Sequence, residues 1–173
     1  MEKKYIDKRQ VRSKICQELL EGKAKSEILA ELENLYYDKD QLTKLVINTP
    51  QPRNKKKYKF QNLLLGILGV ALVLFRFWSF RADYAGSGLS IVTLIMAISV
   101  FSYEAISYRL IAIVSIITCL KYISNYDSHG FIIIDLIMTV VIVGLGFHLG
   151  SKLFPKYGIL GPKKDSNGNV VVD

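Results

Sequence analysis

The sequence predicts an all-α integral membrane protein with four transmembrane helices and a small N-terminal cytoplasmic three-helix domain. Three observations predict this fold class. Residues 60–150 contain four long apolar tracts, residues 1–49 are polar with apolar residues at helical spacing, and basic residues flank the apolar region on both sides. Hydrophobic residues make up 50% of the 173 positions, and they are concentrated in those four tracts.

Residues 1–49 form the predicted head, a group of three short helices. Apolar residues recur there three or four positions apart. We expect Gly22 to end the first helix, Ser26 to cap the second, and Asp38, with Gln41 three residues later, to cap the third. So small a core predicts marginal stability unless the head packs on a partner, on a second copy or on the membrane. The predicted core residues are Val11, Ile15, Leu19, Ile28, Leu32, Leu35, Leu42, Leu45 and Val46.

A basic, proline-containing linker is predicted at residues 50–59. Pro50 and Pro52 would stop the third helix and begin a stiff segment. Basic residues are expected at the cytoplasmic end of a span, where each attracts anionic lipid headgroups by about 1 kcal/mol. The membrane-surface basic residues of this linker are Arg53, Lys55, Lys56, Lys57 and Lys59.

The transmembrane domain is predicted at residues 60–150, with spans at about 60–80, 85–103, 105–123 and 130–150. Tracts of about 20 residues, at about 1.5 Å of rise per residue, cover about 30 Å, which is the hydrocarbon thickness of a bilayer. None of the four tracts offers a polar face wide enough for a water-soluble helical bundle. The sequence therefore predicts that the chain crosses a lipid bilayer four times.

Both chain ends are predicted in the cytoplasm, as a multi-pass protein of the inner (plasma) membrane. The first ten residues contain no apolar stretch, so we expect no signal peptide. An even number of spans places the linker and the basic tail, residues 151–173, on one side, and the positive-inside rule assigns that side to the cytoplasm. Within the tail, Asn167-Gly168 permits a hairpin, although a frayed tail is favoured.

Three ionisable residues inside the apolar tracts form a predicted intramembrane charge cluster: Arg76, Asp135 and Lys121. Counted from the middle of their spans, Arg76 and Asp135 both lie about 8 to 9 Å toward the outer leaflet. An unpaired carboxylate in hydrocarbon costs a few kcal/mol. We therefore predict that Asp135 pairs with Arg76, with Lys121 as the second candidate. In the alternative, both basic side chains extend to the outer headgroups and Asp135 is protonated or reaches water.

Small residues on the first and fourth spans predict close helix packing. Gly66 and Gly69 share a face with Arg76, while Gly146 and Gly150 form a GxxxG pair on a face with Asp135. Small residues at this spacing let helix backbones approach closely in lipid. We expect the two glycine rows to pack against each other in the inner leaflet.

Several function classes are disfavoured by the sequence. No catalytic, metal-ligating or phosphate-binding motif is apparent, so we expect a protein that is not an enzyme and needs no cofactor or metal. The predicted third helix has lysines beside aspartates and is nearly neutral, which makes nucleic acid an unlikely partner and leaves membrane-tethered DNA binding as a third choice.

Two functions remain for the predicted architecture. The favoured one is a membrane-anchored adaptor or accessory subunit, which binds a protein partner through residues 1–49 or assembles as a homo-oligomer. The alternative is a small oligomeric pore or transporter that uses Arg76, Asp135 and Lys121.

Overall fold

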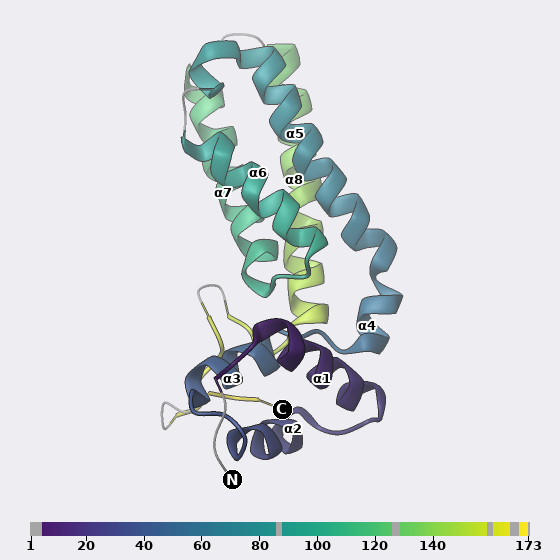
Figure 1. Ribbon diagram of the computed structural model, residues 1–173. Helices are drawn as coiled ribbons and strands as arrows, with labels where there is room; N and C mark the ends of the chain where they lie inside the picture. The colour runs from purple at the N-terminus through teal and green to yellow at the C-terminus, as the bar shows by residue number, and fades with distance from the viewer. Residues whose placement is uncertain (1–4, 86–87, 126–128, 159–160, 167–169, 173) are drawn as a thin grey trace. The chain divides into compact units, whose positions relative to one another are not determined.

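The computed structural model describes residues 5–85, 88–125, 129–158, 161–166 and 170–172 and is helical throughout its regular elements, which confirms the helical fold class (Figure 1). The chain forms two compact units. One, here called the head–tail unit, comprises Met1–Lys57 together with Lys152–Asp173; the other, the bundle unit, comprises Tyr58–Ser151.

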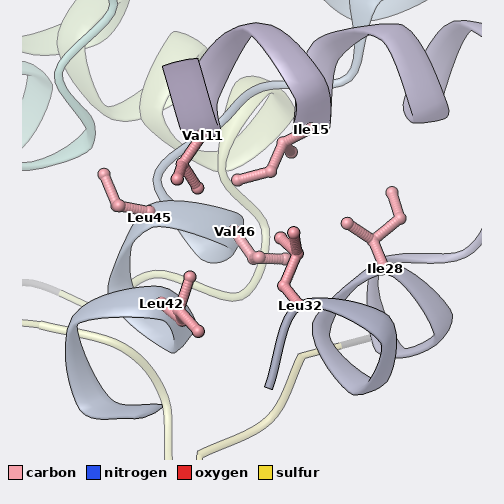
Figure 2. Packing of buried hydrophobic residues seen from close by; sticks show 7 residues of the cluster. All are labelled: Val11, Ile15, Ile28, Leu32, Leu42, Leu45 and Val46. Atoms are coloured by element: carbon pink, nitrogen blue, oxygen red, sulfur yellow. The ribbon is translucent and has the colours of Figure 1, made fainter. Parts of the chain in front are cut away.

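Three helices of the head–tail unit enclose a small apolar core. They are α1 (Lys8–Leu20), α2 (Lys25–Glu33) and α3 (Lys39–Ile47). Figure 2 shows side chains from all three helices pointing toward one another. Leu19 and Leu35, which were predicted in this core, are only partly buried and pack at its edge. The buried members are Val11, Ile15, Ile28, Leu32, Leu42, Leu45 and Val46.

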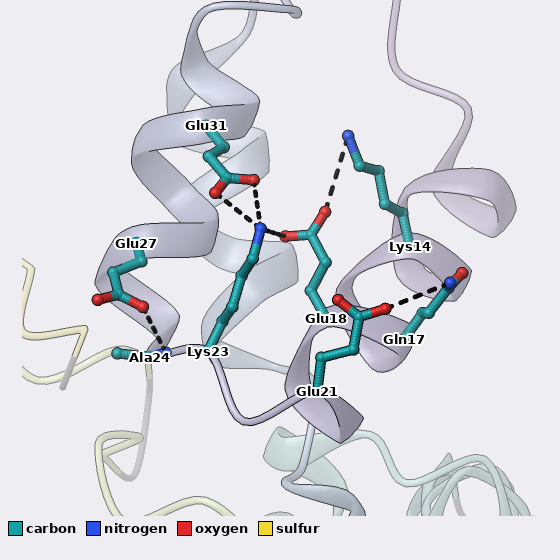
Figure 3. A network of polar contacts seen from close by, with 8 residues as sticks. All are labelled: Lys14, Gln17, Glu18, Glu21, Lys23, Ala24, Glu27 and Glu31. Atoms are coloured by element: carbon teal, nitrogen blue, oxygen red, sulfur yellow. Dashed lines mark hydrogen bonds and ion pairs between the residues drawn. The ribbon is translucent and has the colours of Figure 1, made fainter.

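The connection from α1 to α2 is held by backbone and side-chain contacts. Gly22 ends α1 as predicted, because its φ of 91° is left-handed and lets the next amide, of Lys23, reach the carbonyl of Glu18 at 3.2 Å. Lys23 then donates to Glu31 of α2 at 2.8 Å (Figure 3). This hydrogen bond raises the pKa of the Lys23 ammonium above its ordinary value of 10.5.

Of the two predicted N-caps, the one of α3 is confirmed and the one of α2 is not. Asp38 caps α3, since its carboxylate accepts a hydrogen bond from the Gln41 amide at 2.9 Å. The predicted cap of α2 was wrong: Ser26 lies within the first turn, and the N-cap is Ala24. Alanine suffices there because the Glu27 carboxylate accepts from the Ala24 amide at 3.1 Å (Figure 3).

The predicted linker contains a short helix, α4 (Pro52–Lys57). Pro52 stands at its first position, where a proline lacks only an amide hydrogen that the helix would not use. The segment that was predicted to be stiff is thus helical from Pro52 to Lys57. Its basic side chains are exposed: Arg53, Lys55, Lys56 and Lys57, followed by Lys59 at the start of the next helix.

The tail folds with the head instead of fraying. Leu153 and Phe154 are buried, and Val172 packs against the core of α1 to α3. The chain doubles back through antiparallel bridges, Tyr157 to Pro162 and Lys164 to Val170. The predicted turn at Asn167-Gly168 lies outside the described residues.

The bundle unit consists of α5 (Lys59–Ala85), α6 (Gly88–Phe101), α7 (Ala105–Asn125) and the first part of α8 (His129–Leu153). Three segments, Lys59–Ser79, Ala105–Ile123 and Phe131–Leu153, are long and apolar enough to cross a membrane. The fourth helix, α6, has 14 residues. At about 1.5 Å per residue it covers about 21 Å, less than a typical hydrocarbon core of about 30 Å. It packs against both α5 and α7.

Candidate functional site

A charged pair lies in the interior of the bundle unit. Arg76 of α5 and Asp135 of α8 are 0% and 1% exposed. The Arg76 Nε donates to Oδ1 of Asp135 at 2.6 Å, and Nη2 donates to Oδ2 at 3.0 Å. This geometry is bidentate, the strongest arrangement of a guanidinium on a carboxylate. The structure thus brings together two residues that are 59 positions apart in the sequence.

Three further residues, Thr139, Ser115 and Tyr122, surround the guanidinium. Its Nη2 also donates to Oγ1 of Thr139 at 3.1 Å and to the backbone oxygen of Ser115 at 3.2 Å. The ring of Tyr122 lies 6.0 Å from Cζ, at the outer limit of a cation–π contact. Three helices therefore contribute to one polar centre, here called the Arg76 centre: Arg76, Asp135, Thr139, Ser115 and Tyr122.

Lys121, the second predicted partner of Asp135, is not part of the Arg76 centre. Its side chain is exposed, whereas Thr118 and Tyr122, its near neighbours on α7, are buried. A long basic side chain on a lipid-facing surface can extend its ammonium toward the headgroups. Of the three residues in the predicted charge cluster, the structure thus joins two.

The glycines of the two predicted rows meet helices other than those expected. A Cβ atom at Gly69 of α5 would lie 2.7 Å from Ile111 of α7, and Gly66 faces Phe101 of α6. On α8, a Cβ atom at Gly146 would lie 2.5 Å from the backbone oxygen of Tyr108 of α7. Gly150 also faces α7, where the Cβ of Tyr108 would be 3.3 Å away. The predicted contact between the two rows was wrong, because each row packs on α6 or α7.

A second polar network lies where α6 ends. Asn62 of α5 donates from Nδ2 to the backbone oxygen of Val100 at 3.1 Å, and the hydroxyl of Tyr108 donates to Oδ1 of Asn62. Val100 is in the last turn of α6, where carbonyls have no partner within the helix. The following turn passes through Tyr103 at φ 56°, the left-handed conformation that closes a helix C-terminus. Asn62 and Tyr108 therefore stabilise an interior helix end.

Asn62 is a polar residue within the apolar tract at residues 60–80, whereas the sequence does not single out Tyr108. An asparagine in an apolar tract is the available signal, since such residues hydrogen-bond across helices in lipid. Tyr108 carried no comparable signal, because a tyrosine near the end of a span is equally typical of the interface.

The chemistry of the Arg76 centre is that of a neutralised, enclosed ion pair. Its carboxylate is occupied by the guanidinium, and neither side chain is accessible from outside the bundle. Within the described ranges, no group of three or more His, Cys, Asp or Glu side chains is arranged to hold a metal ion. Comparison of the chain with family models, with curated proteins and with solved structures finds no match.

Proposed function

We propose that the protein is a four-span membrane protein whose cytoplasmic head–tail unit acts as a membrane-anchored adaptor or accessory subunit. The observation that carries the proposal is that the two chain ends fold together. Val172 packs on the core of α1 to α3, and Asn54 donates from Nδ2 to the backbone oxygen of Lys152 at 3.2 Å. A unit built from both ends requires both ends on one side of the membrane.

The joined ends favour an even number of crossings. Three crossings by the long apolar helices alone would leave the head and the tail in different compartments. Counting α6 as the fourth crossing removes this conflict. Its shortness is tolerable because lipid can thin locally, and because Asn62 satisfies a carbonyl at its end. The basic residues near the span ends then favour a cytoplasmic position for the head–tail unit.

The adaptor role is supported by the separate fold of the head–tail unit. A protein that only spans the membrane needs no second unit with its own core. This unit also has an open groove of about 570 Å³ between α2, α3 and the tail. The groove combines apolar residues such as Leu29 and Val170 with the charged Lys39, Asp40 and Lys44. Mixed apolar and charged surfaces of this kind are typical of interfaces with other proteins.

The Arg76 centre supports a structural role for the bundle in preference to conduction. A conducting path needs polar groups or water across the membrane thickness. Here the ionised residues are buried and bonded to each other. They hold α5 to α8 and, through Ser115, to α7.

Photocrosslinking from the groove tests the adaptor role. A photoreactive amino acid at Thr43, in the groove, should give a discrete adduct in intact membranes, while the same substitution at the exposed Lys8 of α1 should not. An adduct at twice the mass of the chain would identify self-assembly as the form of the interaction. Absence of any discrete adduct at Thr43 would reject the adaptor role.

Liposome flux tests the alternative function. Purified protein in sealed vesicles should leave ion permeability unchanged. Flux that is abolished by Asp135→Asn would support a pore instead.

A further inference from the structure

The head–tail unit contains a second, smaller cavity, of about 120 Å³. Four separate stretches of the chain meet at its wall: α2, the end of α3, the start of α4, and the tail. The polar residues of the wall are Lys25, Gln51, Asn54 and Lys156. Among the described residues that line it, none is acidic. The wall is therefore cationic.

One of the two cations is held in a fixed position. The ammonium of Lys25 donates to the backbone oxygen of Thr49 at 2.7 Å and to that of Ile47 at 3.2 Å. Ile47 is the last residue of α3 and Thr49 lies just beyond it, so the ammonium is at the C-terminus of the helix, where a cation is favoured by the helix dipole. Since the ammonium is immobilised, an anion in the cavity would meet a positive charge that requires little further ordering.

The rest of the wall is apolar, and besides Ile47 and Val172 it comes from the chain at the end of α8. Leu153, Phe154 and Pro155 line the cavity beside Lys156. Leu153 is the last residue of the apolar helix segment Phe131–Leu153, and Phe154 and Pro155 follow it directly; Asn54 precedes the first such segment, Lys59–Ser79, by five residues. Several residues of the cavity wall are thus within a few residues, along the chain, of the ends of two helices that can cross a membrane.

We propose that this cavity binds a phosphate group, and that its source is the headgroup of an anionic phospholipid. The lysines Lys25 and Lys156 would contact the phosphate oxygens, the amides of Gln51 and Asn54 would complete the polar side, and Leu153 to Pro155 would contact the first carbons of the acyl chains. A phosphate accepts several charge-assisted hydrogen bonds at once, which suits a wall with two ammonium groups and two amides. The lipid source rests on the proposed membrane topology, whereas the phosphate chemistry does not.

This site differs from the diffuse attraction of the exposed lysines of α4. Diffuse attraction depends on charge near the surface and falls about fivefold in affinity for each lysine removed, whichever lysine it is. A defined site depends on position. Lys156→Gln and Lys56→Gln remove the same charge, but only Lys156 lines the cavity, and Lys56 is exposed on α4.

The test measures thermal unfolding of the full chain in neutral detergent with soluble ligands at matched ionic strength. Dihexanoyl phosphatidic acid should raise the unfolding midpoint of the wild type and of Lys56→Gln equally, and dihexanoyl phosphatidylcholine should raise neither. Lys156→Gln should lose at least tenfold in apparent affinity, and Lys156→Arg should retain binding. The wild-type titration needs no variant, so a misfolded variant does not obscure the result.

Three outcomes would change or overturn the assignment. Inorganic phosphate binding as tightly as phosphatidic acid would keep the phosphate site and reject its lipid source. No response to either ligand would overturn the site. Equal losses of apparent affinity in Lys156→Gln and Lys56→Gln would show that binding depends on diffuse charge, and would also overturn the assignment of a defined site. Because the titration uses isolated protein, it is independent of the crosslinking that tests the adaptor role.

Discussion

Removing either member of the buried ion pair should destabilise the bundle strongly, and removing both should not. With Asp135→Leu, the Arg76 guanidinium would keep hydrogen bonds to Thr139 and the Ser115 carbonyl but would lose its counter-charge. An uncompensated buried charge of this kind costs about 3–5 kcal/mol. Arg76→Met would leave the carboxylate alone, at a similar cost. The double variant replaces the buried ion pair by apolar side chains, a change that often leaves the free energy of unfolding nearly unchanged.

A double-mutant cycle in lipid bicelles measures this coupling as the free energy of unfolding of four proteins. The account predicts a coupling energy of about 6–10 kcal/mol, because each single variant loses about 3–5 kcal/mol while the double variant is nearly neutral. Lys121→Met is the matched control: it removes a charge from an exposed position of the same bundle and should cost less than either buried single variant. Additive losses in the double variant would refute the reasoning, since independent sites would then explain the data.

Three further predictions concern packing, hydrogen bonding and pH. Gly146→Ala should lower the free energy of unfolding by about 1–3 kcal/mol, because the new Cβ would lie 2.5 Å from a backbone oxygen of α7; Gly144→Ala, with nothing within 4 Å, should leave it unchanged. Asn62→Leu should cost about 1–3 kcal/mol, because it removes both the Nδ2 donor to the Val100 oxygen and the Oδ1 acceptor of the buried Tyr108 hydroxyl, and denaturant unfolding would show it. The hydrogen bond to Glu31 raises the pKa of Lys23, and its contribution to the stability of the head is therefore complete below pH 10.5. This contribution is lost as the pH rises through the raised pKa, and alkaline unfolding of Lys23→Met should lack this loss.

The spacing of residues along the sequence predicted those parts of the fold that depend on local chemistry. Helical spacing of apolar residues identified the side chains that α1, α2 and α3 bury, since an amphipathic helix can hide only one face. Counting residues from the middle of each predicted span placed Arg76 and Asp135 at the same depth, because the rise per residue of a helix is nearly constant. The same counting placed Lys121 nearby but could not tell that its side chain is exposed.

Other features depend on contacts that a local pattern does not encode. The glycine rows indicated close packing, but small residues carry no information about which helix approaches them. The tail contains too few apolar residues to predict a fold alone, and Val172 is partly buried because the head supplies the opposing surface. Ser26 was the better cap by residue type, yet the Glu27 carboxylate satisfies the exposed amide and makes an alanine sufficient.

Cysteine labelling tests the central claim, that both ends of the chain lie on the same side of the membrane and fold together. Cys16 reports on the head, Ser166→Cys reports on the exposed part of the tail, and Cys119→Ser removes the buried thiol. With a membrane-impermeant maleimide, the account predicts no labelling of either position in intact cells and labelling of both after permeabilisation. Labelling of one position but not the other in intact cells would contradict it, because the two ends would then lie in different compartments.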